Sequence, residues 1–173
     1  HLVFNMFTLW WVGSELEAKW GSKPFLKYYL TCGVGAGVIY FIGVLVFAAI
    51  TGQVQPLQIP VIGASGAIFG LMLAYGILFG ERQLLFMMLF PIKARYFIML
   101  LAAIEVSMLL THGIGGGKVA NLAHLGGIII GFIYLTIWTR ISRNNRNASS
   151  GGGKKSRLTL VVNNDKNKPK YWN

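Results

Sequence analysis

The stretch "VIGASGAIFG" (Val61–Gly70) places a serine, Ser65, between small residues at the beginning of a long apolar run. The run from Val61 to Gly80 holds 20 residues without a charge, and about 20 apolar residues allow a helix to cross a bilayer. A soluble hydrolase would hold such a serine on a turn between a strand and a helix, but no strand is expected in these surroundings. The stretch therefore predicts a serine at the mouth of a membrane-spanning helix.

Apolar stretches recur along the chain, which has 173 residues and is 54% hydrophobic. Together with a positive mean hydropathy, this composition is too apolar for an ordinary soluble domain. The segment 81–95 is bounded by charges, contains Pro91 and is too short to span, so we expect it to lie at the membrane interface. We therefore expect an all-α, polytopic transmembrane helix bundle whose five spans lie at about 1–14, 28–50, 61–80, 96–110 and 120–139.

Residues 140–173 carry most of the positive charge of the chain. They hold nine Lys and Arg against one acid, a net charge of +8, whereas residues 1–139 hold seven against four, a net charge of +3. The total of +11 therefore reflects a tail and gives no reason to expect nucleic-acid binding. We expect residues 1–139 to form the membrane domain and residues 140–173, which include "RNNRNASSGGGKKSR", to form a basic disordered tail.

Lys and Arg are unevenly distributed between the two sides of the expected bundle. Several lie between the first and second spans, between the third and fourth, and after the fifth, whereas the opposite segments, 51–60 and 111–119, hold only Lys118. The positive-inside rule then places the C-terminus in the cytoplasm, and we expect a multi-pass protein of a bacterial inner membrane. Cys32 is the one cysteine, which excludes an internal disulfide and a cysteine-based metal cluster.

Polar side chains fall at a similar depth near the outer ends of three expected spans. His1 and Asn5 lie on the first span, Ser65 lies about one turn into the third, and Asn121 and His124 lie on the fifth. Ionisable groups are costly at membrane depth and usually face the bundle interior or water. We therefore expect these side chains to share a hydrated cavity.

This set of side chains permits acyl transfer. A serine hydroxyl needs a base within hydrogen-bond reach, and a histidine such as His124 suits that role. His1 and Asn5 are four residues apart and share a helix face, so both can donate hydrogen bonds to an oxyanion. The Ser65 amide lies near a helix N-terminus, where backbone donors are unpaired, and is a third candidate donor. No metal or cofactor is expected.

Each group also has a purely structural interpretation. Ser65 can bond its own helix backbone, and the glycines around it can form a helix contact surface. His124 can be a satisfied interior histidine, and His1 with Asn5 can form hydrogen bonds between helices. The residue types and spacing leave these alternatives open, because they do not show whether Ser65 and His124 face each other.

Three motifs, in this order, resemble those of the rhomboid intramembrane serine proteases. They are "HLVFN" (1–5), "GASG" (63–66) and "AHLGGIIIG" (123–131), which match the family patterns His-x-x-x-Asn, Gly-x-Ser-Gly and Ala-His-x-x-Gly-x-x-x-Gly. The stretch "GSELEAKWGSKPFLKYYL" also resembles the first cytoplasmic loop of the family. The likeness covers about residues 1–139. It implies that a first core helix and an outer loop should precede His1, so we expect the chain to be truncated at its N-terminus.

The resemblance implies a role for each motif residue. Ser65 would be the nucleophile and His124 the general base, a dyad without a third carboxylate. His1, Asn5 and the Ser65 amide would form the oxyanion hole. The supporting positions would be an aromatic ring against the histidine and glycines that allow close approach, namely Phe69, Gly63, Gly66, Gly127 and Gly131.

The fourth span has two expected features. The resemblance implies that it would be the lateral gate for a substrate helix, and that segment 111–119 after it would cap the cavity. The span also contains one acid, Glu105, which either bonds to this cap or serves as a structural polar contact. We expect the structural contact.

We therefore expect an intramembrane serine protease that hydrolyses a peptide bond in or near the transmembrane segment of a membrane-protein substrate. Its partners would be the lipid bilayer and transmembrane substrates, without nucleic acid, metal or cofactor. One alternative is a non-catalytic rhomboid-like protein that binds membrane helices. Another is a small transporter that uses Glu105 and the histidines as a proton path.

Overall fold

The computed structural model describes residues 2–52, 64–86, 90–112 and 120–150, which form five helices and one two-stranded sheet. The elements in chain order are α1 (Leu2–Trp20), α2 (Ser22–Thr51), α3 (Ser65–Leu78), β1 (Gln83–Phe86), β2 (Phe90–Lys93), α4 (Ala94–His112) and α5 (Ala120–Ser150). The helical membrane bundle predicted from the sequence is confirmed, and the short β-hairpin is an addition to it.

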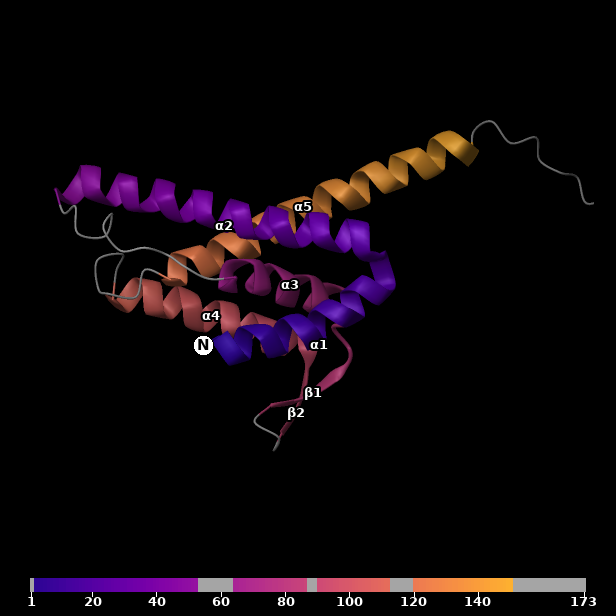
Figure 1. Cartoon of the computed structure of the whole chain (residues 1–173), viewed down its shortest axis with the longest axis horizontal. Helices are drawn as coiled ribbons and strands as arrows, with labels where there is room; N and C mark the ends of the chain where they lie inside the picture. Colours follow the sequence, from indigo (N-terminus) through magenta and orange to yellow (C-terminus); the bar gives the residue numbers. More distant parts are fainter. Residues whose placement is uncertain (1, 53–63, 87–89, 113–119, 151–173) are drawn as a thin grey trace, which may run out of the picture. The chain divides into compact units, whose positions relative to one another are not determined.

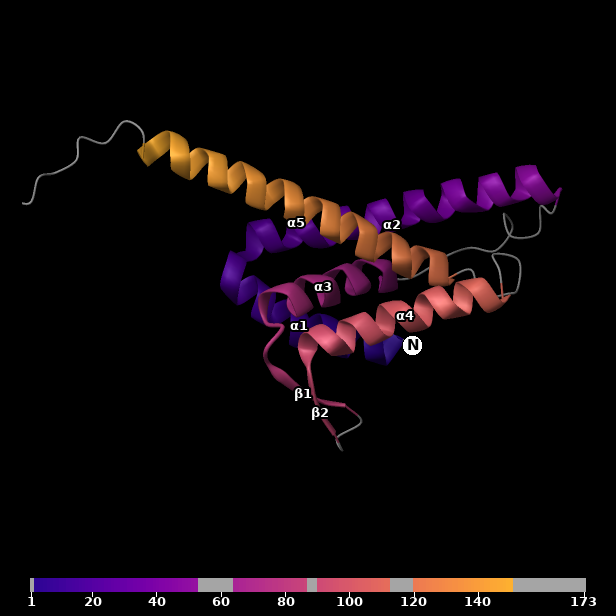
Figure 2. The same ribbon diagram turned by 180° about the vertical axis from the view of Figure 1, so that it is seen from behind.

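α3 is the central helix of the bundle. Figures 1 and 2 show it between α2 and α5 on one side and α1 and α4 on the other. Small residues dominate its buried positions, so the surrounding helices can approach its backbone closely. These buried positions are Gly66, Ala67, Ile68, Gly70, Leu71, Ala74, Tyr75 and Gly76.

The boundary between α1 and α2 is one residue long, whereas the expected spans at about 1–14 and 28–50 left residues 15–27 between them. α1 continues to Trp20 because Glu15–Trp20 contains no helix-breaking residue. Gly21 then interrupts the helix with a φ of 84°, a left-handed value that favours glycine. Pro24 lies in the first turn of α2, where its missing N–H costs no hydrogen bond within the helix.

Two helix boundaries differ from the expected spans. α3 begins at Ser65 and not near Val61, so the serine is the first residue of the helix and does not lie one turn inside it. α5 continues to Ser150, eleven residues beyond the expected end at 139, so residues 140–150 are helical and not disordered. No glycine or proline occurs between Arg140 and Ser150, so nothing in this segment forces the helix to stop.

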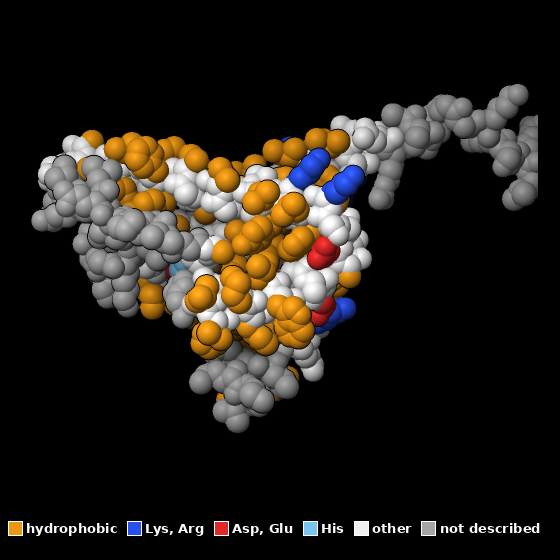
Figure 3. Space-filling model, in the orientation of Figure 1, with side chains coloured by type: hydrophobic (Ala, Val, Ile, Leu, Met, Phe, Trp, Pro, Cys, Tyr) orange, Lys and Arg blue, Asp and Glu red, His pale blue; other side chains and the backbone are white. Residues whose placement is uncertain are grey.

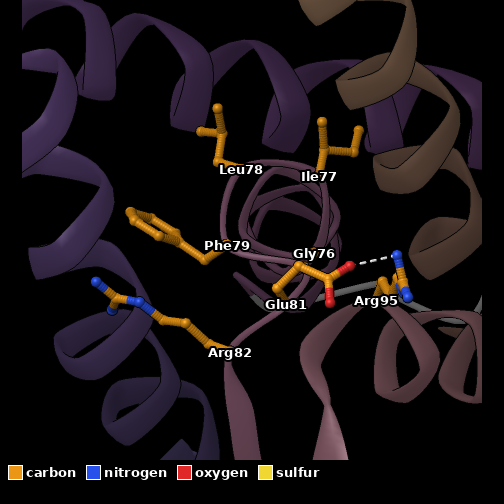
Figure 4. Close-up of a pocket in the computed structure, with 8 residues that line it drawn as sticks. Gly76, Ile77, Leu78, Phe79, Glu81, Arg82 and Arg95 are labelled. Carbon is orange, nitrogen blue, oxygen red and sulfur yellow. Dashed lines mark ion pairs between the residues drawn. The ribbon is translucent and has the colours of Figure 1, made fainter.

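The segment that was expected at the membrane interface forms an antiparallel hairpin of β1 and β2. Its base is tied to the end of α3, because the Ala94 amide donates to the Arg82 carbonyl at 2.8 Å and the Arg95 amide donates to the Gly80 carbonyl at 3.2 Å. Side chains repeat this link: Glu81 pairs with Lys93 at 2.7 Å and also with Arg95. Figure 4 shows the Glu81–Arg95 pair beside the end of α3. The hairpin is therefore anchored by backbone and charge together.

The Glu81 ion pairs predict a small loss of stability in acid. The hydrogen bond from Lys93, aided by the charge of Arg95, lowers the pKa of the Glu81 carboxyl. A carboxyl with a lowered pKa in the folded state stabilises the fold above its ordinary pKa, and this contribution disappears as the pH falls through the lowered value. We expect Glu81→Gln to melt slightly below the wild type at neutral pH and to match it in strong acid. Thermal unfolding in detergent across this pH range measures the difference in melting temperature between the two proteins. A difference that is the same at every pH would contradict the ion pairs of Glu81.

Three described helices are long and apolar enough to cross a membrane, namely Ser22–Thr51, Ala94–Thr111 and Asn121–Asn145. α1 is not among them because Glu15, Glu17 and Lys19 lie in its second half. α3 is apolar but has only 14 residues. Figure 3 shows apolar side chains spread over the face in view, with most of the visible charged side chains toward one edge. The expected five spans therefore remain a prediction for α1 and α3.

Candidate active site

Ser65 and His124 form the centre of the site. The Ser65 Oγ lies 2.9 Å from the His124 Nε2, which is hydrogen-bond distance. Ser65 is the first residue of α3, and His124 lies in the second turn of α5. The hydroxyl and the imidazole therefore meet although 59 positions separate them in the sequence.

The N-terminus of α3 supplies backbone donors next to the serine. Ala64 precedes the helix and makes no side-chain cap, and its carbonyl accepts the first helical hydrogen bond, from Ile68 at 3.0 Å. The amides of the first turn have no acceptor within their own helix, and the helix dipole makes this end positive. The Ser65 amide therefore lies in a position that suits the binding of a negative oxygen.

Glycines bring α5 against α3 and so bring His124 to Ser65. A Cβ atom at Gly127 would overlap the Gly66 carbonyl oxygen, and one at Gly70 would lie 3.2 Å from the Gly127 carbonyl oxygen. One turn further along α5, a Cβ at Gly131 would lie 2.5 Å from the Tyr28 hydroxyl. That hydroxyl donates to the Gly70 carbonyl at 2.8 Å, so α2 also joins this contact. Side chains larger than hydrogen at these glycines would separate the helices.

Phe69 holds the plane of the His124 ring. The two rings stack with centroids 4.3 Å apart and planes 13° from parallel. Phe69 lies one turn after Ser65 on the same face of α3, so the helix that carries the serine also restricts the histidine.

Glu105 of α4 completes the surroundings of His124. Its Oε1 lies 3.0 Å from the His124 Nδ1, and its Oε2 accepts a hydrogen bond from the Asn121 amide at 2.7 Å. The Glu105 and His124 side chains are only 12% and 11% exposed. Glu105 therefore bonds to two residues of α5, and it places a carboxylate beside the expected dyad that the resemblance did not imply.

The predicted oxyanion residues are only partly described. Asn5 lies on α1 and is half-buried, and it has an interaction with its surroundings. His1 and Gly63 lie outside the described residues, as does most of the predicted cap at 111–119. Among the described residues, no group of three or more His, Cys, Asp or Glu could hold a metal ion.

Comparison with known proteins assigns the chain to a family. A family model described as the Rhomboid domain matches residues 1–141. The chain belongs to the rhomboid family. It is therefore an integral membrane protein, in agreement with its apolar helices.

Three rhomboid relatives illustrate the similarity. The chain is 28% identical to RHOMBOID-like protein 12, mitochondrial, of Arabidopsis thaliana over 149 residues, which are 83% of this chain and 43% of that protein. It is 29% identical to Rhomboid protein 1, mitochondrial, of Saccharomyces cerevisiae, over 78% of this chain and 36% of that protein. It is 32% identical to Rhomboid protease GluP of Bacillus subtilis, over 76% of this chain and 22% of that protein. No solved structure matches the chain.

These rhomboid relatives correct one prediction and set a limit on the others. The expected bacterial inner membrane is not supported, because two of these three relatives have mitochondrial names. The chain spans less than half the length of each of the three. A rhomboid-type function follows from the family, whereas the reaction, its residues and its substrates are proposals.

Sequence reasoning noticed Glu105 but missed its partner. The available signal was a single acid within an apolar helix, which is costly unless a neighbouring helix supplies a donor. His124 and Asn121 are three residues apart and share one face of α5, so they offered two such donors. The sequence did not show that α4 turns Glu105 toward this face.

Proposed function

We propose that the protein is an intramembrane serine protease that hydrolyses a peptide bond in or near the transmembrane segment of a membrane-protein substrate. The observation that carries the proposal is the 2.9 Å separation of the Ser65 Oγ and the His124 Nε2 within a helical membrane bundle. A serine hydroxyl is a weak nucleophile, and a histidine at this distance can act as its general base. If Ser65 and His124 served only in packing, neither their hydrogen bond nor the position of Ser65 at the N-terminus of α3 would be required.

The proposed reaction begins when His124 Nε2 accepts the Ser65 hydroxyl proton as the Oγ attacks the substrate carbonyl carbon. The resulting oxyanion receives hydrogen bonds from the Ser65 amide, Asn5 and His1. His124 then returns the proton to the departing amine as the C–N bond breaks, which leaves an acyl-enzyme on Ser65. A water molecule, deprotonated by His124, attacks this ester, releases the new carboxyl terminus and regenerates the hydroxyl.

The substrate helix is proposed to enter beside α4. An apolar cavity of about 760 Å³ lies among α1, α3, α4 and the hairpin, with the aromatic rings of Phe7, Trp11 and Phe97 among its walls. Its residues on α3 lie in the half of the helix away from Ser65, and neither Ser65 nor His124 lines it, so it would hold the part of the substrate that lies beyond the scissile bond. Such a surface suits an apolar segment that leaves the lipid. A helix hides its carbonyls in internal hydrogen bonds, so the substrate must unwind near the scissile bond, and residues that weaken helices are expected there.

Covalent labelling by a fluorophosphonate probe tests this function. We expect the probe to label the wild type at Ser65, Ser65→Ala to remain unlabelled, and His124→Ala to be labelled at least about 100-fold more slowly because the nucleophile has lost its base. Ser14→Ala is the matched control, since Ser14 is an exposed serine whose hydroxyl donates to the Trp11 carbonyl. It should be labelled as fast as the wild type.

Three outcomes would overturn parts of the proposal. Equal labelling of His124→Ala and the wild type would remove the histidine base. A wild type that is neither labelled nor cleaves a transmembrane substrate, yet retains substrate helices on purification, would support the non-catalytic helix-binding alternative. Charge-dependent flux through an unlabelled protein would support the transporter.

A further inference from the structure

Both oxygens of the Glu105 carboxylate are bonded within the bundle, and both bonds lead to α5. One oxygen contacts the His124 ring at 3.0 Å and the other accepts from the Asn121 amide at 2.7 Å. An ionised carboxylate only accepts hydrogen bonds, so the Asn121 amide donor and a proton on the His124 Nδ1 both suit it. A carboxylate this deeply buried is costly unless its hydrogen bonds compensate the loss of water.

We propose that Glu105 is a positioning residue that acts on Ser65 through His124, so that the site operates as a Ser–His–Glu triad. The inference rests on the proposed protease function and adds a third member to its catalytic pair. The three groups lie in a continuous line of hydrogen bonds, from the Ser65 Oγ through both ring nitrogens of His124 to the Glu105 Oε1. The line joins three helices, α3, α5 and α4.

The carboxylate selects the reactive form of the histidine. His124 Nε2 can accept the serine hydroxyl proton only when it carries no proton itself, so the neutral ring must keep its proton on Nδ1. An acceptor on the Nδ1 side holds the proton there. The same contact fixes the rotation of the ring, whose plane Phe69 already restricts by stacking at 4.3 Å.

The carboxylate also stabilises the charge that forms during the reaction. When His124 takes the hydroxyl proton it becomes an imidazolium, and a negative group 3.0 Å away favours that state. Glu105 neither gains nor loses a proton in this scheme, since the transferred proton moves only between Ser65, His124 and the leaving amine. Asn121 holds the second oxygen and so prevents the carboxylate from turning away from the ring.

The test measures kcat and KM separately for cleavage of a transmembrane substrate by the protein in proteoliposomes. Glu105→Gln keeps the shape of the side chain but removes its charge and offers an amide that favours the wrong tautomer. We expect kcat to fall about 10²- to 10⁴-fold with little change in KM or melting temperature. Glu105→Asp restores the carboxylate on a shorter side chain, and its kcat should be at least about tenfold higher than that of Glu105→Gln. Ser107→Ala, an exposed position two residues further along α4, is the control and should match the wild type.

The outcomes separate this inference from the proposed function. Full kcat in Glu105→Gln, with no cleavage by Ser65→Ala, would overturn the triad and leave the protease intact. A kcat that falls and recovers together with the melting temperature in both Glu105→Gln and Glu105→Asp would assign Glu105 a structural role and also overturn the triad. A wild type that neither cleaves nor reacts with the fluorophosphonate probe would overturn the protease itself.

Discussion

Replacing Ser65 or His124 with alanine is expected to lower the rate of transmembrane substrate cleavage by about 10⁴- to 10⁶-fold. Ser65→Ala removes the atom that is proposed to form the acyl-enzyme, and His124→Ala removes the group, 2.9 Å away, that is proposed to accept its proton. Because the two side chains act as a unit, the double variant should be about as inactive as either single variant. Single-turnover cleavage in proteoliposomes, with enzyme in excess over substrate, measures the loss without interference from product release.

Stability provides the control for this experiment. Both side chains lie in or near the N-terminal turns of their helices, and alanine leaves no bulky group to accommodate. We therefore expect both variants to melt within a few degrees of the wild type. Substrate cleavage that persists in Ser65→Ala would contradict the protease assignment, whereas cleavage that persists only in His124→Ala would mean that another group serves as base.

Substitution of Gly127 is expected to have the second largest effect, because it acts on fold and site together. The added Cβ of Gly127→Ala would overlap the Gly66 carbonyl oxygen, and both atoms belong to helix backbones that cannot move independently. Overpacking of this kind costs about 1–3 kcal/mol and here separates α5 from α3. Since α5 carries His124 and α3 carries Ser65, we expect a lower melting temperature and a loss of at least about tenfold in the rate of fluorophosphonate labelling.

Gly37 offers the matched control for Gly127. It is also a glycine within a helix, but a Cβ added there meets no atom within 4 Å. Gly37→Ala should therefore keep full labelling and melt at or slightly above the wild-type temperature, because alanine favours a helix by about 1 kcal/mol over glycine. If Gly127→Ala behaved like Gly37→Ala, the close contact of α3 and α5 would not position the dyad.

The helices were predictable from the sequence because apolar runs of spanning length have few other interpretations. Their ends were less predictable. Glu15, Glu17 and Lys19 lie beyond the expected end of the first span, yet nothing in them breaks a helix, and the break occurs at Gly21, where φ is positive. The segment after Arg140 was expected to be disordered for its polarity, but it lacks glycine and proline as far as Ser150 and remains helical.

The hairpin at 83–93 was not predicted because the same apolar residues also fit a segment that lies at the membrane interface. Its residues are apolar enough for a membrane interface, and Pro91 argues against a central strand. A strand at the edge of a two-stranded sheet tolerates proline. The cross-links that hold the base of the hairpin are backbone hydrogen bonds, from the Ala94 amide to the Arg82 carbonyl and from the Arg95 amide to the Gly80 carbonyl. These cross-links become visible only when the end of α3 and the start of α4 are placed side by side.

The sequence motifs supplied the candidate residues of the site, whereas the contacts between these residues were not predictable. Spacing within one helix shows which side chains share a face, as with His124 and Asn121 on α5. It does not show the rotation or height of one helix relative to another, which depends on packing at Gly66 and Gly127. The position of Glu105 depends on a third helix, so its role as partner of His124 lay beyond the reach of sequence patterns.

α3, which carries Ser65, is shorter than the bilayer is thick, so the thickness of the bilayer does not set its position directly. Its 14 residues rise about 21 Å, whereas the hydrocarbon layer is about 30 Å thick. A helix of this length does not have to match the thickness of the hydrocarbon layer, and the longer helices around it shield it from lipid. Lipids with longer or shorter tails would therefore act first on the long apolar helices α2, α4 and α5. Because His124 lies on α5, the close contact of α5 with α3 at Gly127 and Gly66 must keep His124 beside Ser65 when α5 tilts.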